Sequence, residues 1–270
     1  MKALDKLLLK NDELKFVCVG LDSDLNKIPK YLLSETEPIL EFNRNIVEAT
    51  KEFAAAYKIN FAFYEALGQK GFEIIEKTLE FIPDDILTIA DAKRGDIENT
   101  SEMYAKSVFE HFGFDAITLH PYMGKDSLQP FLNYKDKLNF ILALTSNPGY
   151  IDFEKQILKD GTFLYQKVIS SVAQWNQYKN CGIVFGATNL DELQLNINLF
   201  SDLSILLPGV GAQGGSFEDV IKIFHQHKRK NFIVNVSRAM IYLSSDKDFS
   251  QLAEKEIQKL NDIAKTIFIK

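Results

Sequence analysis

The chain has 270 residues, of which 46% are hydrophobic and 25% are charged, and its formal net charge is −6. This length and composition suffice for one large core, so we expect a single domain over residues 1–270. The negative charge argues against a general nucleic-acid-binding surface, and no uninterrupted apolar run approaches the length that spans a membrane. We therefore expect neither nucleic acid nor a membrane as a partner.

The first residues and the cysteines indicate the compartment. Residues 1–16 are charged throughout and contain only a three-leucine run, unlike a secretory signal. The two cysteines, Cys18 and Cys181, are too few for a disulfide framework, and Cys18 lies within an apolar run. We interpret Cys18 as a buried thiol in a reducing compartment and predict a cytoplasmic protein.

Short apolar runs alternate with longer helical patterns along the chain. The predicted strands are 16–21, 54–60, 87–93, 116–120, 140–146, 182–187, 204–209 and 232–237. Helical patterning covers 35–52, 97–111, 161–178, 189–199, 216–227 and 248–267. Near-continuous apolar strands are typical of a parallel sheet covered by helices, and eight strand–helix units close a TIM (β/α)8 barrel. An open doubly wound sheet is the alternative within the α/β class.

Polar or turn-forming residues follow nearly every predicted strand, whereas the strand interiors are largely apolar. The strand ends carry Asp22, Lys58 with Asn60, Asp91 with Lys93, His120, Thr145 with Ser146, Pro208 with Gly209, and Ser237 with Arg238. Barrel enzymes place their chemistry at the C-terminal strand ends. The pattern therefore predicts a polar site at that face.

The segment Leu87–Asp96 carries the most specific signal. Asp91 and Lys93 are two apart on a strand and share a face, and Gly95 would let the chain turn and return Asp96 to the same place. Lys58 ends the neighbouring strand, which completes a nearly neutral set of two lysines and two aspartates, with Lys93 buried between carboxylates. The alternative is a structural ion pair, with Asp96 as the N-cap of the following helix.

The loop at residues 208–216 contains the pattern G-x-G-x-x-G. A dinucleotide site is disfavoured, because only one predicted strand follows and the basic run 227–230 stands where an acidic residue is expected. In a barrel, the loops after strands seven and eight bind phosphate through glycine amides and a helix N-terminus. The Arg238 guanidinium would then bind the phosphate with two parallel hydrogen bonds. A merely structural turn is the alternative.

Metal chemistry is not indicated by the histidines. His225 and His227 are two apart on a predicted helix and do not face one another, and His120 has no second histidine or cysteine nearby. We interpret His120 as a structural hydrogen-bonding residue. With no metal-ligand cluster and no nucleophile elbow in the sequence, we expect neither a metal nor an organic cofactor.

Together these segments resemble a known family, orotidine 5′-phosphate decarboxylase. The resemblance rests on Lys58–Asn60, DAKRGD at 91–96, TSNPG at 145–149, PGVGAQGG at 208–215 and Ser237 with Arg238. The chain length and the AKRGD sequence are similar to the second bacterial subgroup of the family. The similarity extends from about residue 18 to 240, and five segments in this order are highly specific.

The resemblance implies decarboxylation of orotidine 5′-monophosphate to uridine 5′-monophosphate, the last step of de novo UMP synthesis, in a homodimer with no cofactor. By position Lys93 matches the proton donor to C6 of the pyrimidine, and Asp91 matches the carboxylate beside the leaving group. Lys58 matches the lysine that orients this carboxylate and the ribose. Asp96 and Thr100 match residues that reach into the partner's site. The remaining residues match family residues that contact the substrate. Asp22 matches a contact to the ribose, Ser146 and Pro208 match contacts to the base, and Gln213 and Arg238 match contacts to the phosphate. No site residue is assigned between 150 and 160, where the chain departs from shorter family members.

Three other functions are alternatives for this sequence. A sugar-phosphate decarboxylase or aldol-type synthase of the same superfamily resembles the chain in D-x-K-x-x-D, but it typically uses magnesium and an acidic residue where this chain has Lys58 and Asn60. A non-catalytic nucleotide-phosphate-binding protein would keep the glycine loop and Arg238 without needing the charged set. A dinucleotide oxidoreductase is disfavoured by the context of the glycine loop.

Overall fold

Eight parallel strands form a closed barrel in the computed structural model, which describes residues 1–200, 202–211 and 213–269. The strands are β1 (Val17–Gly20), β2 (Ala56–Asn60), β3 (Leu87–Arg94), β4 (Ala116–Leu119), β5 (Leu138–Leu144), β6 (Cys181–Phe185), β7 (Ser204–Leu207) and β8 (Phe232–Val236). Each strand pairs with its neighbours in the chain, and β8 returns to pair with β1. The predicted TIM barrel is confirmed, and the open doubly wound sheet is excluded.

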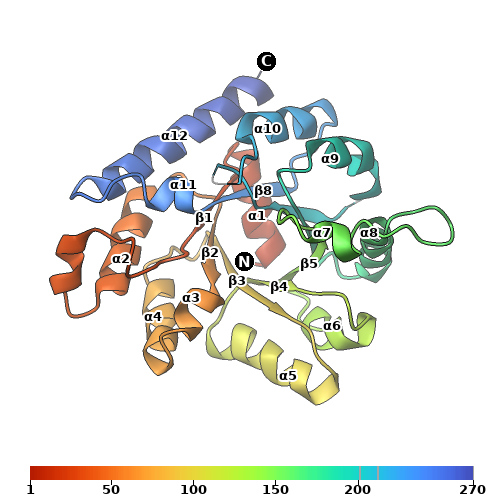
Figure 1. Ribbon diagram of the computed structural model, residues 1–270, viewed down its shortest axis with the longest axis horizontal. Helices are drawn as coiled ribbons and strands as arrows, with labels where there is room; N and C mark the ends of the chain where they lie inside the picture. The colour runs from red at the N-terminus through yellow and green to blue at the C-terminus, as the bar shows by residue number, and fades with distance from the viewer. Residues whose placement is uncertain (201, 212, 270) are drawn as a thin grey trace.

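Helices surround this ring of strands, and one helix lies across its N-terminal end (Figure 1). They are α1 (Ala3–Asp12), α2 (Pro38–Thr50), α3 (Phe61–Glu65), α4 (Gln69–Leu79), α5 (Glu98–Lys106), α6 (Lys125–Leu132), α7 (Tyr150–Phe153), α8 (Leu164–Trp175), α9 (Leu190–Asn196), α10 (Phe217–Gln226), α11 (Arg238–Ile241) and α12 (Phe249–Phe268). The six predicted helical ranges correspond to α2, α5, α8, α9, α10 and α12. None of the helices in the described part of the chain has the length and apolar character needed to cross a bilayer.

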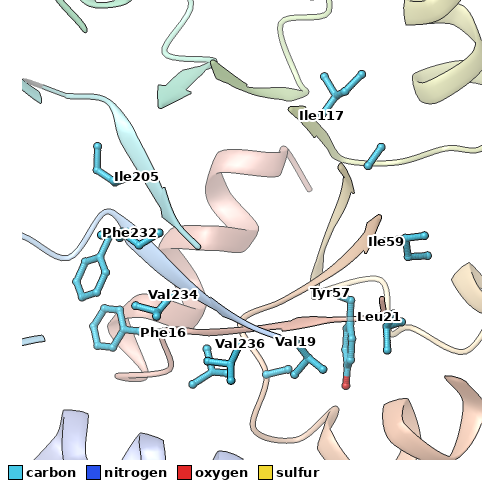
Figure 2. Packing of buried hydrophobic residues seen from close by; sticks show 14 of the residues in the cluster. Phe16, Val19, Leu21, Tyr57, Ile59, Ile117, Ile205, Phe232, Val234 and Val236 are labelled. Atoms are coloured by element: carbon cyan, nitrogen blue, oxygen red, sulfur yellow. The ribbon is translucent and has the colours of Figure 1, made fainter. Parts of the chain in front are cut away.

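The side chains of each strand alternate between two cores, as the period of two in a strand requires. On β1, Val17 and Val19 belong to the layer between barrel and helices, whereas Cys18 belongs to the barrel interior. Figure 2 shows the outer layer, where Val19, Tyr57 and other strand residues point away from the barrel. Both faces of the strands are therefore buried, which explains their near-continuous apolar sequences.

Helix α1 closes the N-terminal end of the barrel. Ala3 and Leu7 are buried in the same cluster as the first residues of β2 to β5. The Lys6 ammonium lies 2.8 Å from a carboxylate oxygen of Asp115, at the start of β4, and both side chains are largely buried. Because this end is plugged, a ligand has access only from the C-terminal strand ends.

Both cysteines are buried free thiols, as predicted for Cys18. Cys18 lies inside the barrel, where burial raises the pKa of its thiol to about 12. A thiol that stays protonated at neutral pH is a poor nucleophile. Cys18 is thus part of the core rather than a reactive group.

Candidate active site

The C-terminal strand ends surround a pocket of about 270 Å³. Of the ten site residues predicted from sequence, eight line it: Asp22, Lys58, Asp91, Lys93, Ser146, Pro208, Gln213 and Arg238. Asp96 and Thr100 lie outside it. The predicted polar face of the barrel is therefore a pocket built from residues of at least six strands or their following loops.

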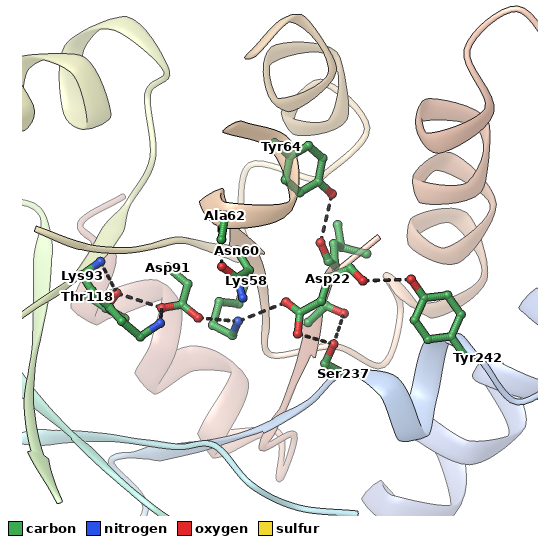
Figure 3. Close-up of polar contacts among 12 residues, drawn as sticks. Asp22, Lys58, Asn60, Ala62, Tyr64, Asp91, Lys93, Thr118, Ser237 and Tyr242 are labelled. Atoms are coloured by element: carbon green, nitrogen blue, oxygen red, sulfur yellow. Dashed lines mark hydrogen bonds and ion pairs between the residues drawn. The ribbon is translucent and has the colours of Figure 1, made fainter. Parts of the chain in front are cut away.

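One wall of the pocket is a line of alternating charges (Figure 3). The Lys93 ammonium lies 2.6 Å from Asp91 Oδ1, and the Lys58 ammonium lies 2.8 Å from Asp91 Oδ2. Lys58 also reaches Asp22 Oδ1 at 3.5 Å, and Ser237 donates to Asp22 Oδ2 at 2.7 Å. The line runs across β3, β2, β1 and the end of β8, and its two lysines and two aspartates carry no net charge.

The charges in the middle of this line stabilise one another. Only 5% of the Lys58 side chain and 11% of the Asp91 side chain are exposed. Burial alone would raise the pKa of Asp91, but Lys58 and Lys93 outweigh it and hold that pKa well below its usual range. Burial alone would lower the pKa of Lys58, but Asp91 and Asp22 raise it above its ordinary value. Lys58 and Asp91 therefore stay ionised throughout the neutral range.

A pH dependence of stability follows from the low pKa of Asp91. Below the unfolded-state pKa of about 3.9, Asp91 is protonated in the unfolded chain but stays ionised in the folded protein. The stabilisation that the ionised Asp91 provides is therefore lost as pH falls. We expect the difference in free energy of unfolding between wild type and Asp91→Asn to shrink by about 1 kcal/mol from pH ~5 to pH ~3. Urea unfolding followed by circular dichroism measures this difference. A difference that stays constant over the range would contradict the pairing.

Lys93 lies in an unusual backbone conformation at the mouth of the pocket. Its φ is +48°, and the β3–β4 register shifts between Ala90 and Arg94. A lysine in the left-handed region costs about 1–3 kcal/mol, which is typical of residues held at functional sites. The expectation that Lys93 is buried was wrong, because half of its side chain is exposed. The irregular backbone lifts it from the barrel interior, so that its ammonium faces both Asp91 and the open pocket.

Thr118 is a functional candidate that the sequence reasoning missed. Its hydroxyl accepts the Lys93 backbone N–H at 3.0 Å and donates to Asp91 Oδ1 at 2.9 Å. One side chain thus fixes both the backbone of Lys93 and the orientation of the Asp91 carboxylate. Counting back in twos from His120 along β4 would have indicated that Thr118 points inward.

The backbone around Asp22 is held by two tyrosines that were also missed, Tyr64, which is buried, and Tyr242, which is partly buried. Tyr64 donates its hydroxyl to the carbonyl of Leu21 at 3.0 Å, and Tyr242 donates to the carbonyl of Asp22 at 2.8 Å. The Asp24 N–H in turn donates to the Tyr242 hydroxyl at 2.8 Å. Figure 3 shows the two rings on different sides of the β1 end. The chain that carries Asp22 is thereby fixed relative to Lys58.

The opposite wall of the pocket is apolar at its base and polar at its rim. Leu142, Val184 and Leu206, from β5, β6 and β7, lie at the base. At the rim Ser146 donates to Gln213 Oε1 at 2.7 Å and joins the β5 end to the glycine loop. A ligand would therefore contact ions on one side and apolar groups on the other.

The glycine loop satisfies several of its own amides. Gly209, Gly211 and Gly214 adopt φ values of +105°, +79° and +89°. The N–H groups of Gly211, Gly214 and Gly215 donate to carbonyls within the loop. In this conformation these three amides are not available to a phosphate, in contrast to the expected cradle of glycine amides. Gln213 and the exposed Arg238 are the side chains that remain for an anion.

The residues after Lys93 turn away from the pocket of their own chain. Asp96 Oδ1 accepts the N–H of Ile97, and Ile97 rather than Asp96 is the N-cap residue of α5. Gly95 has no left-handed φ. A Cβ there would lie 2.9 Å from the carbonyl oxygen of His120, so close packing rather than a turn requires glycine. Thr100 is exposed in the first turn of α5.

The carboxylates of the pocket are already occupied by cations. Asp91 and Asp22 both face Lys58, so the carboxylates of both residues are paired with one ammonium. Over the described residues, no group of three His, Cys, Asp or Glu side chains is arranged to hold a metal ion. The donor set suits ammonium–carboxylate chemistry.

A closed barrel with ionised side chains gathered at its C-terminal strand ends defines a (β/α)8-barrel enzyme. The chain matches the Orotidine 5′-phosphate decarboxylase / HUMPS family over residues 15–249 and belongs to that family. This confirms the resemblance seen in the five sequence segments.

The chain is similar to named relatives and to a solved structure over most of its length. It is 47% identical over 251 residues to orotidine 5′-phosphate decarboxylase of Christiangramia forsetii, covering 92% of this chain and 91% of the relative. It is 43% identical over 266 residues to the Dehalococcoides mccartyi protein of the same name, covering 97% of each. The structure of Leishmania donovani OMP decarboxylase superposes with a TM-score of 0.81 at 34% identity, covering 98% of this chain and 99% of that one.

Proposed function

We propose that this protein decarboxylates orotidine 5′-monophosphate to uridine 5′-monophosphate and carbon dioxide, the last step of UMP synthesis. The observation that carries the proposal is the line of alternating charges from Lys93 to Asp22 at the mouth of the barrel. Family membership, with relatives that bear this activity in their names, supports the choice of substrate. The direct test is the ultraviolet absorbance change of orotidine 5′-monophosphate with purified protein.

Lys93 is the proposed proton donor. Cleavage of the bond between C6 and the carboxylate leaves its electron pair on C6 and releases neutral carbon dioxide. The Lys93 ammonium stabilises that developing negative charge and then gives C6 a proton. Three observations support this role. The side chain of Lys93 is half-exposed at the pocket mouth, its ammonium is hydrogen-bonded to Asp91, and its backbone N–H donates to the Thr118 hydroxyl.

Asp91 and the apolar base of the pocket act on the leaving group. Asp91 remains an anion, so a substrate carboxylate beside it is repelled, and this repulsion is relieved as carbon dioxide forms. Leu142 and Val184 offer a neutral product a better environment than a charged reactant. Lys58 keeps Asp91 and Asp22 in place and is itself a buried part of the site.

The remaining pocket residues bind the nucleotide. Asp22 takes the ribose hydroxyls, Ser146 and Pro208 contact the base, and Gln213 and Arg238 hold the phosphate. The order of these residues around the rim supports the assignment, because Ser146 and Gln213 are hydrogen-bonded to each other between the base and phosphate sides.

The active enzyme is proposed to be a homodimer in which Asp96 and Thr100 complete the partner's site. Both residues lie outside the pocket of their own chain, at the start of α5. Exposed apolar side chains flank them, with 61% of Ile97 and 54% of Met103 accessible. Exposed apolar groups next to polar site residues are typical of an interface.

A magnesium-dependent sugar-phosphate enzyme is the second candidate within the same superfamily. The position of Lys58 favours the decarboxylase over it. We expect full activity with orotidine 5′-monophosphate after exhaustive treatment with a chelator, because Lys58 supplies the positive charge between the carboxylates. Activity that is lost and then restored by magnesium would move the assignment to the sugar-phosphate class.

A further inference from the structure

The segment between α7 and α8, residues 154–163, has no role in the function proposed so far. It follows the pocket-lining residues at the end of β5 by only a few positions, and Figure 1 shows α7 close to β5 and α8. Most of its tip is exposed. Its first residue, Glu154, is instead half-buried and points back toward the pocket rim.

Glu154 binds Thr145 with both carboxylate oxygens. The Thr145 N–H donates to Oε2 at 2.6 Å. The Thr145 hydroxyl lies 2.8 Å from Oε1 and 2.7 Å from Oδ1 of Asn147, and its one proton serves these two acceptors. The remaining polar group of Thr145, its carbonyl, accepts the side-chain amide of Asn189 at 2.9 Å. Every backbone and side-chain polar group of Thr145 is therefore held by a residue outside β5.

Because Thr145 is held in place, the position of the next residue, Ser146, is restricted as well. A Cβ on Gly186 would lie 3.0 Å from the backbone of Ser146, and a Cβ on Gly209 would lie 3.1 Å from its Cβ. Ser146 therefore fits between two glycines with no room to shift, while its hydroxyl reaches Gln213. A small rotation of Thr145 would displace the Ser146 hydroxyl from the pocket.

The carboxylate of Glu154 is held by neutral donors in the described part of the chain. The adjacent cation, Lys155, pairs with Glu192 of α9 instead. Burial of an anion without a cation is costly, and it raises the pKa of Glu154 above its usual value. Glutamine could keep both contacts, because its carbonyl oxygen can accept the Thr145 N–H and its NH2 group can donate to the Thr145 hydroxyl oxygen. Only removal of the side chain therefore breaks the link between Glu154 and Thr145.

We propose that Glu154 is a positioning residue for recognition of the base: it fixes Thr145 and thereby presents Ser146 to the pyrimidine. The segment at 154–163 is then a support for the base-binding side of the pocket. This inference rests on the proposed function, in which Ser146 contacts the base.

The test compares Glu154→Ala, which removes both acceptor oxygens from Thr145, with Asp152→Ala, which removes a carboxylate from an exposed position of α7, away from Thr145. We expect Glu154→Ala to weaken binding of uridine 5′-monophosphate about tenfold, to raise KM more than it lowers kcat, and to leave binding of ribose 5-phosphate unchanged. Ribose 5-phosphate lacks the base, so a general loss of structure would weaken both ligands equally. Asp152→Ala should match wild type with both.

A measurement without ligand keeps the inference separate from the proposed function. Hydrogen exchange of the Thr145 amide should be at least about tenfold faster in Glu154→Ala than in Asp152→Ala, because only the first variant loses the acceptor of that N–H. Unchanged exchange, or equal weakening of the two ligands, would overturn the role of Glu154. Wild-type protein that leaves orotidine 5′-monophosphate intact would instead refute the proposed function, whatever the exchange result.

Discussion

Replacing Lys93 with alanine is expected to slow decarboxylation at least about 10³-fold, because the variant loses both a positioned proton donor and a charge beside the developing carbanion. Absorbance change with saturating orotidine 5′-monophosphate measures the loss. Alanine is the suitable replacement, since glycine would also relax the φ of +48° and mix backbone effects with chemistry.

Lys93→Ala should still fold and still bind the product. Half of the Lys93 side chain is exposed, and Asp91 keeps its contacts with Lys58 and Thr118 when Lys93 is removed. The thermal midpoint and the affinity for uridine 5′-monophosphate therefore report whether the site is intact. A variant that turns over near the wild-type rate would rule out Lys93 as the proton donor.

Arg238→Ala is the matched contrast to Lys93→Ala. Arg238 lines the pocket and is exposed there, and it is the proposed ligand of the phosphate. Its loss should weaken nucleotide binding by about 2–5 kcal/mol, as expected when one member of a desolvated charge pair is removed. The rate at saturating substrate should fall far less than in Lys93→Ala, which separates binding from chemistry.

The strands and the charged set were predictable from sequence because both depend on local pattern. Each strand is an apolar run buried on two faces, and polar residues at its end reach the same side of the barrel. Helix α1 was not predicted, because its charged residues mask the two apolar side chains, Ala3 and Leu7, that it buries beside Lys10 and Asn11. Its place in the fold depends on contacts with β2 to β5, which are distant in sequence.

The finer geometry of the site depends on contacts between distant parts of the chain. The exposure of Lys93 follows from a register shift against β4, which no pattern within residues 87–96 encodes. Glu154 lies in an irregular segment without periodicity, so its contact with Thr145 exists only once that segment packs against the β5 end. Sequence predicted which residue types gather at the site, whereas packing determines which of them touch.

The proposed shared active site predicts recovery of activity from two inactive variants, Lys93→Ala and Asp96→Ala. In a mixed dimer one site carries both lesions, and the other combines an intact Lys93 with an intact Asp96 from the partner. Unfolding and refolding equal amounts together makes about half of the dimers mixed, each with one restored site, given a two-fold symmetric interface. Roughly a quarter of wild-type activity should therefore return.

Asp91→Asn supplies the control for this experiment, because Asp91 and Lys93 touch within one chain at 2.6 Å. Mixing Lys93→Ala with Asp91→Asn leaves a lesion in every site of every dimer, so nothing should be recovered. Different affinity tags on the two chains show that mixed dimers have formed. If tagged mixed dimers of Lys93→Ala and Asp96→Ala are as inactive as their parents, then Asp96 serves its own chain, where its carboxylate already accepts the N–H of Ile97 before α5.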